Sequence, residues 1–164
     1  MKDEQPIAEF HLQVKTDLKA LTQVSEWLEN IVLPLIPQDL WWQCSLIVNE
    51  GFTNAVRHAH LNLPPETPID IEVKLFANYL EIRIWDRGQP FNLESKLRSI
   101  LQEQRDPLDR EGERGLVFMY KLTDELHYIR TDDRCNCLVM RKNTIRWRQT
   151  SPIQGSFWRS SEGV

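Results

Sequence analysis

Two neighbouring stretches of the sequence place apolar residues at every second position, and they constrain the fold more than any other feature. The first covers residues 69–75 and the second residues 80–86, with Ala77 and Asn78 as a turn between them. Such alternation is typical of strands that bury one face and expose the other, as in antiparallel sheets. We therefore expect an α/β fold: a two-layer sandwich in which helices cover one face of a mostly antiparallel mixed sheet.

The rest of the sequence supplies the helices that such a sheet needs. Apolar residues recur at helical spacing after candidate caps at Thr16 and Asp17, and again after Pro37. The expected elements are a strand over 10–14, helices over 18–32, 38–59 and 115–122, and a hairpin over 125–129 and 135–141. A polar stretch over 87–113 holds only a short helical pattern, and loops of this length are usually functional lids or disordered.

Length and composition fit one globular domain with an appendage. The chain has 164 residues, 41% of them hydrophobic, and a net charge of -4, which gives no reason to expect a nucleic-acid partner. Residues 1–140 hold 15 basic and 23 acidic residues, whereas residues 141–164 hold five basic residues and one acidic. We place one domain at 8–142 and a basic, aromatic extension at 143–164, which we expect to dock on the acidic body or on a partner.

The cysteines and the apolar runs indicate where the protein resides. Cys44, Cys135 and Cys137 cannot form a disulfide framework, and no second pair completes a metal site with the last two. The start of the chain has no apolar signal segment, and Pro34 breaks the apolar run over 31–36. We therefore expect a cytoplasmic protein that does not enter a membrane.

Three polar residues share one side of the second expected helix. Glu50, Asn54 and His58 follow one another at intervals of four, so at about 100° per residue they fall within roughly one quadrant. A carboxylate and an amide side by side can position a hydroxyl and a metal ion. An ordinary solvated helix face explains the same spacing, and on the spacing alone both interpretations stay open.

Two further polar features break the apolar pattern. Asp86 continues the buried phase of its strand, so its carboxylate needs a hydrogen-bond donor. It can cap a turn with Arg87 and Gly88, or it can accept a hydrogen bond from a ligand amine. The segment 112–116 (Gly-Glu-Arg-Gly-Leu) opens the next helix, and a helix N-terminus with exposed amides favours phosphate.

Taken in order, these segments resemble the sequence boxes of the GHKL (Bergerat-fold) ATP-binding superfamily. Residues 50–59 resemble its N box, residues 86–91 its first glycine box and residues 114–116 its second. Within the superfamily, the chain is most similar to bacterial anti-sigma factor serine/threonine kinases, which also share a stretch like 123–126. The resemblance covers about residues 10–142, and three boxes in the right order make it specific.

The resemblance implies a role for each matching residue in nucleotide binding. Asn54 is expected to hold a Mg²⁺ ion that bridges the ATP phosphates. Asp86 is expected to accept a hydrogen bond from the adenine amino group, and Gly88 to let the backbone approach the base. Arg114 and the Gly115 backbone are expected to contact phosphates.

The resemblance also implies the chemistry. Glu50 is expected to act as general base toward a serine or threonine hydroxyl, or to orient the attacking group. His58 fits a structural role better. The function implied is that of an ATP-binding anti-sigma factor that phosphorylates an anti-sigma factor antagonist and sequesters a sigma factor, with a homodimer possible.

Two other functions are weighed against this one. A non-catalytic, nucleotide-dependent partner-switching module is the alternative, favoured by Glu113, because this residue stands where the family commonly has glycine. A histidine-kinase catalytic domain is weaker, since no histidine lies in a recognisable phosphoacceptor helix pair. The four histidines are His11, His58, His60 and His127.

Overall fold

The structure is a computed structural model that describes residues 4–103 and 113–144. Within these ranges, five strands form one sheet of order β1-β2-β3-β5-β4, and each neighbouring pair is antiparallel. The strands are β1 (Ala8–Lys15), β2 (Pro68–Leu75), β3 (Tyr79–Asp86), β4 (Glu125–Arg130) and β5 (Asn136–Asn143). The antiparallel sheet is thus confirmed, and no parallel pair within the described residues gives it a mixed character.

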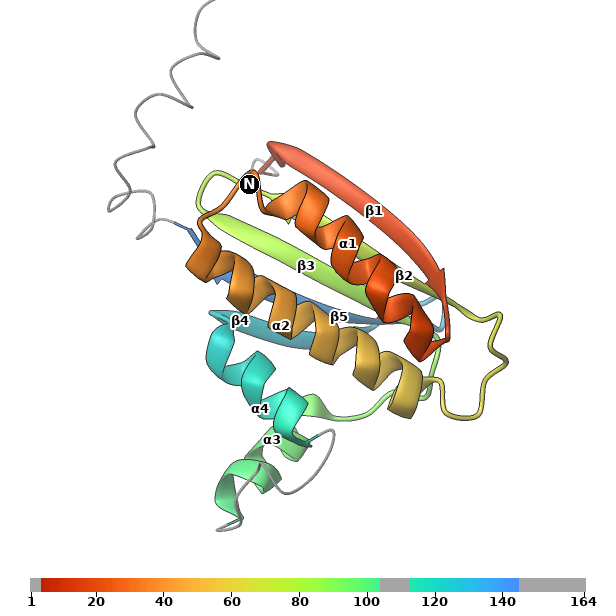
Figure 1. Cartoon of the computed structure of the whole chain (residues 1–164). Coiled ribbons are helices and arrows are strands. Elements are labelled where there is room, and N and C mark those ends of the chain that lie inside the picture. Colours follow the sequence, from red (N-terminus) through yellow and green to blue (C-terminus); the bar gives the residue numbers. More distant parts are fainter. Residues whose placement is uncertain (1–3, 104–112, 145–164) are drawn as a thin grey trace, which may run out of the picture.

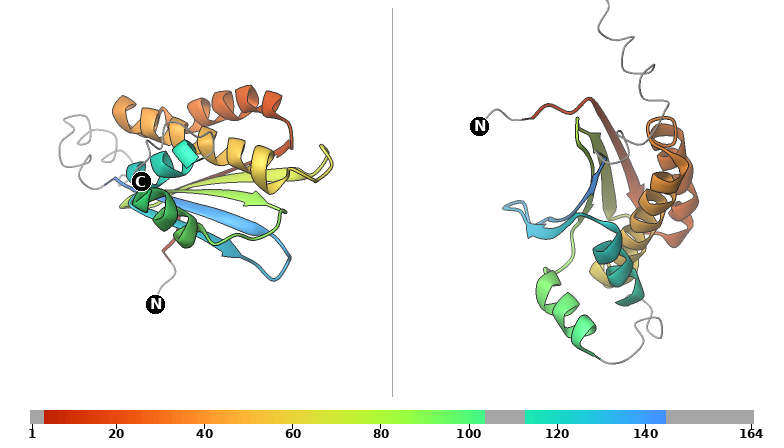
Figure 2. Two further views of the ribbon diagram at one scale, coloured as in Figure 1. Left: turned by 90° about the horizontal axis from the view of Figure 1, so that it is seen from below. Right: turned by 90° about the vertical axis from the view of Figure 1, so that its left-hand side faces the viewer.

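The helices cover one face of this sheet, as the alternation predicts. The covering helices are α1 (Leu21–Val32), α2 (Gln38–Asn54) and α4 (Glu113–Leu122), and the fourth α-helix of the described residues, α3 (Leu93–Gln102), lies outside this layer. Figure 1 shows α1, α2 and α4 lying over the sheet, with α3 beyond α4, and Figure 2 shows the two layers from the side. The chain is therefore the expected two-layer sandwich.

The core lies between these layers because the apolar phase of each strand meets the apolar side of each helix. Ile71, Ile82 and Ile84 are almost fully buried and belong to one apolar cluster with Val48 and Phe52 of α2. Burial of such side chains contributes roughly 1.5–3 kcal/mol each. The same pattern buries Asp86 at the end of β3, as its sequence phase predicts.

The second helix ends differently from the expectation of one continuous α-helix to residue 59. After Asn54 the chain continues as a π-helical turn over Ala55–Ala59, and the amide of His60 donates to the carbonyl of Ala55 at 2.9 Å. Turns of this kind widen a helix and occur often at functional sites. The widened turn lies directly beside the segment that follows β3.

Other expectations from the sequence concern cysteines, membranes and the extension. Cys44, Cys135 and Cys137 are free thiols, and burial raises the pKa of Cys44 to about 12. None of the helices in the described ranges combines the length and apolar character needed to span a bilayer. Most of the predicted extension, residues 145–164, lies outside the described residues, so the boundary at 142–143 stays a prediction.

Candidate functional site

A cavity of about 700 Å³ opens where the end of α2 meets α3, α4 and the segment after β3. Its volume falls within the range of roughly 300–1,000 Å³ typical of ligand pockets. Apolar side chains form much of the wall, including those of Ile84, Leu116, Met119 and Leu138. Polar side chains interrupt that wall, namely those of Asn54, His58, Asn62, Asp86, Arg87, Gln89, Lys96, Glu113 and Tyr128.

The structure brings three of the predicted site residues to this cavity. Asn54 reaches it from α2, Asp86 from the end of β3 and Gly88 from the segment that follows. Asn54 and Asp86 are more than thirty positions apart in the sequence, so it is the tertiary fold that brings them to the same cavity. The convergence is what a binding site requires.

Asp86 is held by donors from three segments. The Gly88 amide donates to Asp86 Oδ1 at 2.9 Å, and the Asn136 side-chain amide donates to the same oxygen at 2.8 Å. The Tyr128 hydroxyl donates to Asp86 Oδ2 at 2.7 Å. The turn-capping contact is therefore present, and the carboxylate also lines the cavity, so the two interpretations of Asp86 are compatible.

Asn136 and Arg130 extend this network behind Asp86. The Asn136 side-chain amide also donates to the Gly88 carbonyl at 2.9 Å, and Arg130 donates to that carbonyl at 3.0 Å. Arg130 donates to the Asn136 side-chain oxygen at 3.2 Å as well. Connected networks of this kind fix side-chain orientation. Sequence reasoning missed both residues, because they lie in strands with no motif around them.

Gly88 is required by a close backbone approach. A Cβ atom at this position would lie 2.7 Å from the carbonyl carbon of Ala59 and even nearer to its oxygen. Backbone cannot move away as a flexible side chain can. Only glycine therefore lets the segment after β3 lie against the end of the π-helical turn.

Glu50 and Gly115 meet at the edge of the site. A Cβ atom on Gly115 would collide with Glu50 Oε2, so the carboxylate lies directly against the first turn of α4. Neither residue is among those that line the cavity. Glu50 thus lies beside the N-terminus of a helix, the place where a phosphate would be favoured.

The start of α4 departs from the expectation in one respect. Arg114 is exposed and does not line the cavity, whereas its neighbour Glu113 does. Gly112 and the rest of the loop over 104–112 lie outside the described residues. The phosphate contact expected of Arg114 therefore stays a prediction.

His60 is a positioning residue that the sequence did not reveal. The Thr16 hydroxyl donates to the Thr67 carbonyl at 2.6 Å, so its oxygen accepts from His60 Nδ1 at 2.7 Å. His60 Nε2 then accepts from the Arg87 amide at 2.8 Å. Burial, opposed in part by Asp86, lowers the pKa of His60, in agreement with a neutral ring.

The charges around the cavity are mixed. Lys96 on α3 and Arg87 supply positive charge, and Asp86 and Glu113 supply negative charge. Partial burial, Lys96 and Arg57 together lower the pKa of His58, which also lines the cavity. An anionic ligand would thus find two cations among the residues that line the cavity.

A magnesium ion fits the donors present here. The described residues contain no group of three or more His, Cys, Asp or Glu side chains that could enclose a metal ion. Mg²⁺ often keeps several waters and takes only one or two protein oxygens besides phosphates. The Asn54 side-chain oxygen at the cavity wall is of the required kind.

The sequence matches one family model over most of its length. The model of the histidine kinase-like ATPase domain matches residues 14–142. This range includes every predicted site residue and ends at the predicted domain boundary.

Two curated relatives are serine-protein kinases called RsbW. The one from Oceanobacillus iheyensis is 35% identical over 101 residues, which cover 60% of this chain and 61% of that protein. The one from Bacillus licheniformis is 31% identical over 86 residues, which cover 50% of this chain and 53% of that protein. The chain therefore spans somewhat over half the length of the curated relatives it matches.

Two solved structures share the fold. The RsbU and RsbW domains of Rv1364c from Mycobacterium tuberculosis match with a TM-score of 0.58 and 14% identity, covering 83% of this chain and 32% of that one. The SiaB–SiaC complex from Pseudomonas aeruginosa matches with a TM-score of 0.55 and 12% identity, covering 85% of this chain and 91% of the matched one. At these identities the likeness shows the fold alone, and it confirms the predicted α/β sandwich.

Proposed function

The chain belongs to the family of histidine kinase-like ATPase domains, and from that premise we propose that it is an ATP-dependent serine/threonine protein kinase acting as an anti-sigma factor. It phosphorylates an anti-sigma factor antagonist and sequesters a sigma factor, in the cytoplasm. A homodimer is compatible with this role. The observation that carries the proposal is the convergence of Asn54, Asp86 and Gly88 on one cavity, with Glu50 beside the start of α4.

In this proposal, residues of the chain bind ATP at its base and at its phosphates. Asp86 accepts a hydrogen bond from the adenine amino group, and Gly88 lets the backbone of its segment approach the base. Asn54 supplies the protein oxygen for Mg²⁺, which when bound neutralises phosphate charge. Arg114 and the amide of Gly115 bind phosphate oxygens at the N-terminus of α4.

The transfer step needs a base close to the phosphates. Glu50 lies against the first turn of α4, where it can accept the proton of a substrate hydroxyl. The hydroxyl oxygen forms a bond to the γ-phosphorus as the bond from that phosphorus to the β,γ-bridging oxygen breaks. The products are a phosphoserine or phosphothreonine and ADP, and the proton passes from Glu50 to solvent.

Two substitutions separate binding from chemistry. Glu50→Gln should leave the thermal shift induced by Mg-ATP nearly intact and lower phosphotransfer at least 100-fold, because the amide cannot accept the proton. Asn54→Ala should reduce both. The measurements are the melting temperature with millimolar Mg-ATP and the transfer of radiolabel to antagonist proteins from the same genome.

Glu29→Gln is the matched control, since Glu29 is an exposed carboxylate on α1, a different helix. It should behave as the wild-type protein in both assays. If the wild-type protein showed no thermal shift at millimolar Mg-ATP, the proposed function would fail at its first step.

One observation favours the non-catalytic partner-switching module as a second candidate. Glu113 lines the cavity at the first turn of α4, where its charge would oppose bound phosphates. ATP binding without any label transfer would support this module. Recovery of transfer in Glu113→Gly would then identify the carboxylate as the cause.

A further inference from the structure

Tyr128 lies on the edge strand β4 and lines the cavity, where Asp86 and Phe91 hold its side chain. Its hydroxyl donates to Asp86 Oδ2 at 2.7 Å, and its ring packs on Phe91 with centroids 4.6 Å apart and planes inclined by 36°. Lys96 Nζ lies 5.9 Å from the centre of the Phe91 ring. The phenol is therefore held in one place by contacts at both ends.

The hydrogen bonds of Asp86 leave one oxygen open. A carboxylate oxygen accepts about two hydrogen bonds. Among the described residues, Asp86 Oδ1 accepts two, from the Gly88 amide and the Asn136 side chain, whereas Oδ2 accepts one, from Tyr128. The remaining capacity thus lies on the oxygen that Tyr128 touches.

Tyr128 adds a second acceptor beside that oxygen. Burial and the bond to Asp86 raise the pKa of Tyr128, so the phenol keeps its proton and directs it to Asp86 at neutral pH. The lone pairs of the phenol oxygen then remain available. Both residues line the same cavity, which gives it two adjacent hydrogen-bond acceptors.

We propose that Tyr128 is a specificity-determining residue: Tyr128 Oη and Asp86 Oδ2 together accept the two N–H groups of an exocyclic amino group on the base. The proposal rests on the proposed function, in which this cavity holds a purine nucleotide. A 6-amino purine satisfies both acceptors. A 6-keto purine directs a carbonyl oxygen at them, and sites built for an N–H donor discriminate strongly against such analogues.

Isothermal titration of the full chain with ATP and ITP, both with Mg²⁺, tests the proposal. The wild-type protein should bind ATP at least tenfold more tightly than ITP. Tyr128→Phe should lower the affinity for ATP by about tenfold and change that for ITP little, so the ratio falls. Tyr120→Phe is the matched control, because Tyr120 on α4 is half exposed and does not line the cavity, and it should keep the wild-type ratio.

A second measurement needs no variant and covers the case in which Tyr128→Phe does not fold. N6-methyl-ATP keeps one N–H group and N6,N6-dimethyl-ATP keeps none, so the affinity of the wild-type protein should fall at each step. Equal affinity for ATP and N6-methyl-ATP would mean a single acceptor and overturn the proposal.

Two results with Tyr128→Phe would also overturn it. An equal loss for ATP and ITP would assign Tyr128 a structural role only, and a gain in ATP affinity would mean that the phenol blocks Asp86. If the wild-type protein bound neither nucleotide, the proposed function would fail. ATP binding with an unchanged ratio in Tyr128→Phe would refute this inference alone.

Discussion

A single histidine links three segments beneath the site. His60 receives a hydrogen bond from the Arg87 amide and gives one to Thr16, so it joins the end of the π-helical turn to the segment after β3 and to the end of β1. A second proton on the ring would sit on Nε2 and point at the Arg87 N–H, which donates to that same nitrogen. The neutral ring is therefore part of the folded state.

This arrangement predicts a pH dependence of stability. The pKa of His60 is lowered in the folded state, so the unfolded chain binds the extra proton first as pH falls. The contribution of neutral His60 to the free energy of unfolding should thus be at its maximum above about pH 6.5. It should decrease as the pH falls from there toward the lowered pKa. Urea denaturation at about pH 7.5 and about pH 5.5 measures the loss.

The variant that tests this assignment is His60→Gln, which does not titrate. Its loss of stability between the two pH values should be smaller than that of the wild-type protein. His127→Gln, at an exposed histidine on β4, should show the full wild-type loss. An unchanged loss in His60→Gln would contradict the assignment.

At the scale of elements, the cavity depends on how α3 begins. The Asn92 side chain caps this helix by accepting from the Ser95 amide at 3.0 Å, and the helix then positions Lys96 at the cavity. Asn92→Ala should lower the free energy of unfolding by about 1 kcal/mol. Faster hydrogen exchange of the first amides of α3 should accompany the loss and locate it.

Serine provides the matched control because its hydroxyl can cap a helix in the same way. Asn92→Ser should restore most of the stability and the protection. If both variants behaved alike, the cap would not be the source of the effect.

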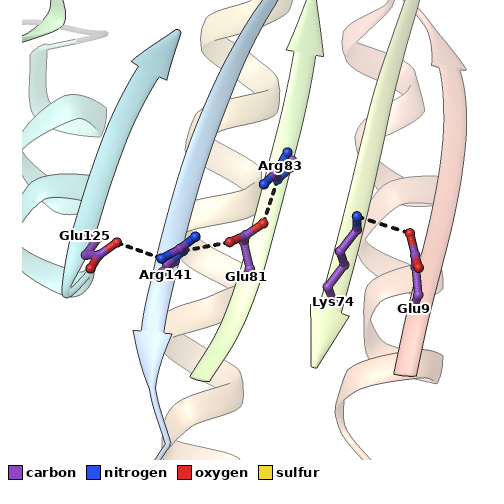
Figure 3. Close-up of polar contacts among 6 residues, drawn as sticks. All are labelled: Glu9, Lys74, Glu81, Arg83, Glu125 and Arg141. Atoms are coloured by element: carbon purple, nitrogen blue, oxygen red, sulfur yellow. Dashed lines mark hydrogen bonds and ion pairs between the residues drawn. The ribbon is translucent and has the colours of Figure 1, made fainter. Parts of the chain in front are cut away.

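At the scale of the whole molecule, ion pairs hold the strands together on the face opposite the helices. Glu81 is only 2% exposed there, and its carboxylate accepts from Arg83 and from Arg141, each at 2.6 Å. Arg141 also pairs with Glu125 at 3.2 Å, which extends the cluster from β3 across β5 to β4. Figure 3 shows this cluster and, apart from it, the pair of Glu9 and Lys74.

Burial should separate the energies of these two groups of ion pairs. Glu81→Ala leaves two arginines facing each other and should destabilise the protein by about 2 kcal/mol. Glu9→Ala removes a carboxylate that is 55% exposed and should cost less than about 1 kcal/mol. Urea denaturation of both variants compares them, and a similar cost for each would show that burial does not govern these pairs.

Much of the fold could be predicted because a sheet with one buried face requires apolar residues at every second position of its strands. The alternation over 69–75 and 80–86 gave two strands, their turn and the buried direction of Asp86 correctly. The spacing of apolar residues also located the helices. Their ends were predicted less accurately, since the π-helical turn at Ala55–Ala59, which lies against Gly88, leaves no periodic signal.

The sequence by itself determined the layers and the strands, since these depend on local periodicity, and the motifs at 50–59 and 86–91 predicted the residues of the candidate site. Only the tertiary structure decided which groups hold Asp86, because Tyr128 and Asn136 lie more than forty positions away and meet it through the order of the strands. Likewise, only the tertiary structure shows that Arg114 is exposed and that Glu113 lines the cavity. Which residues lie beside each other across a sheet depends on strand pairing and register, and no local pattern in the sequence specifies these.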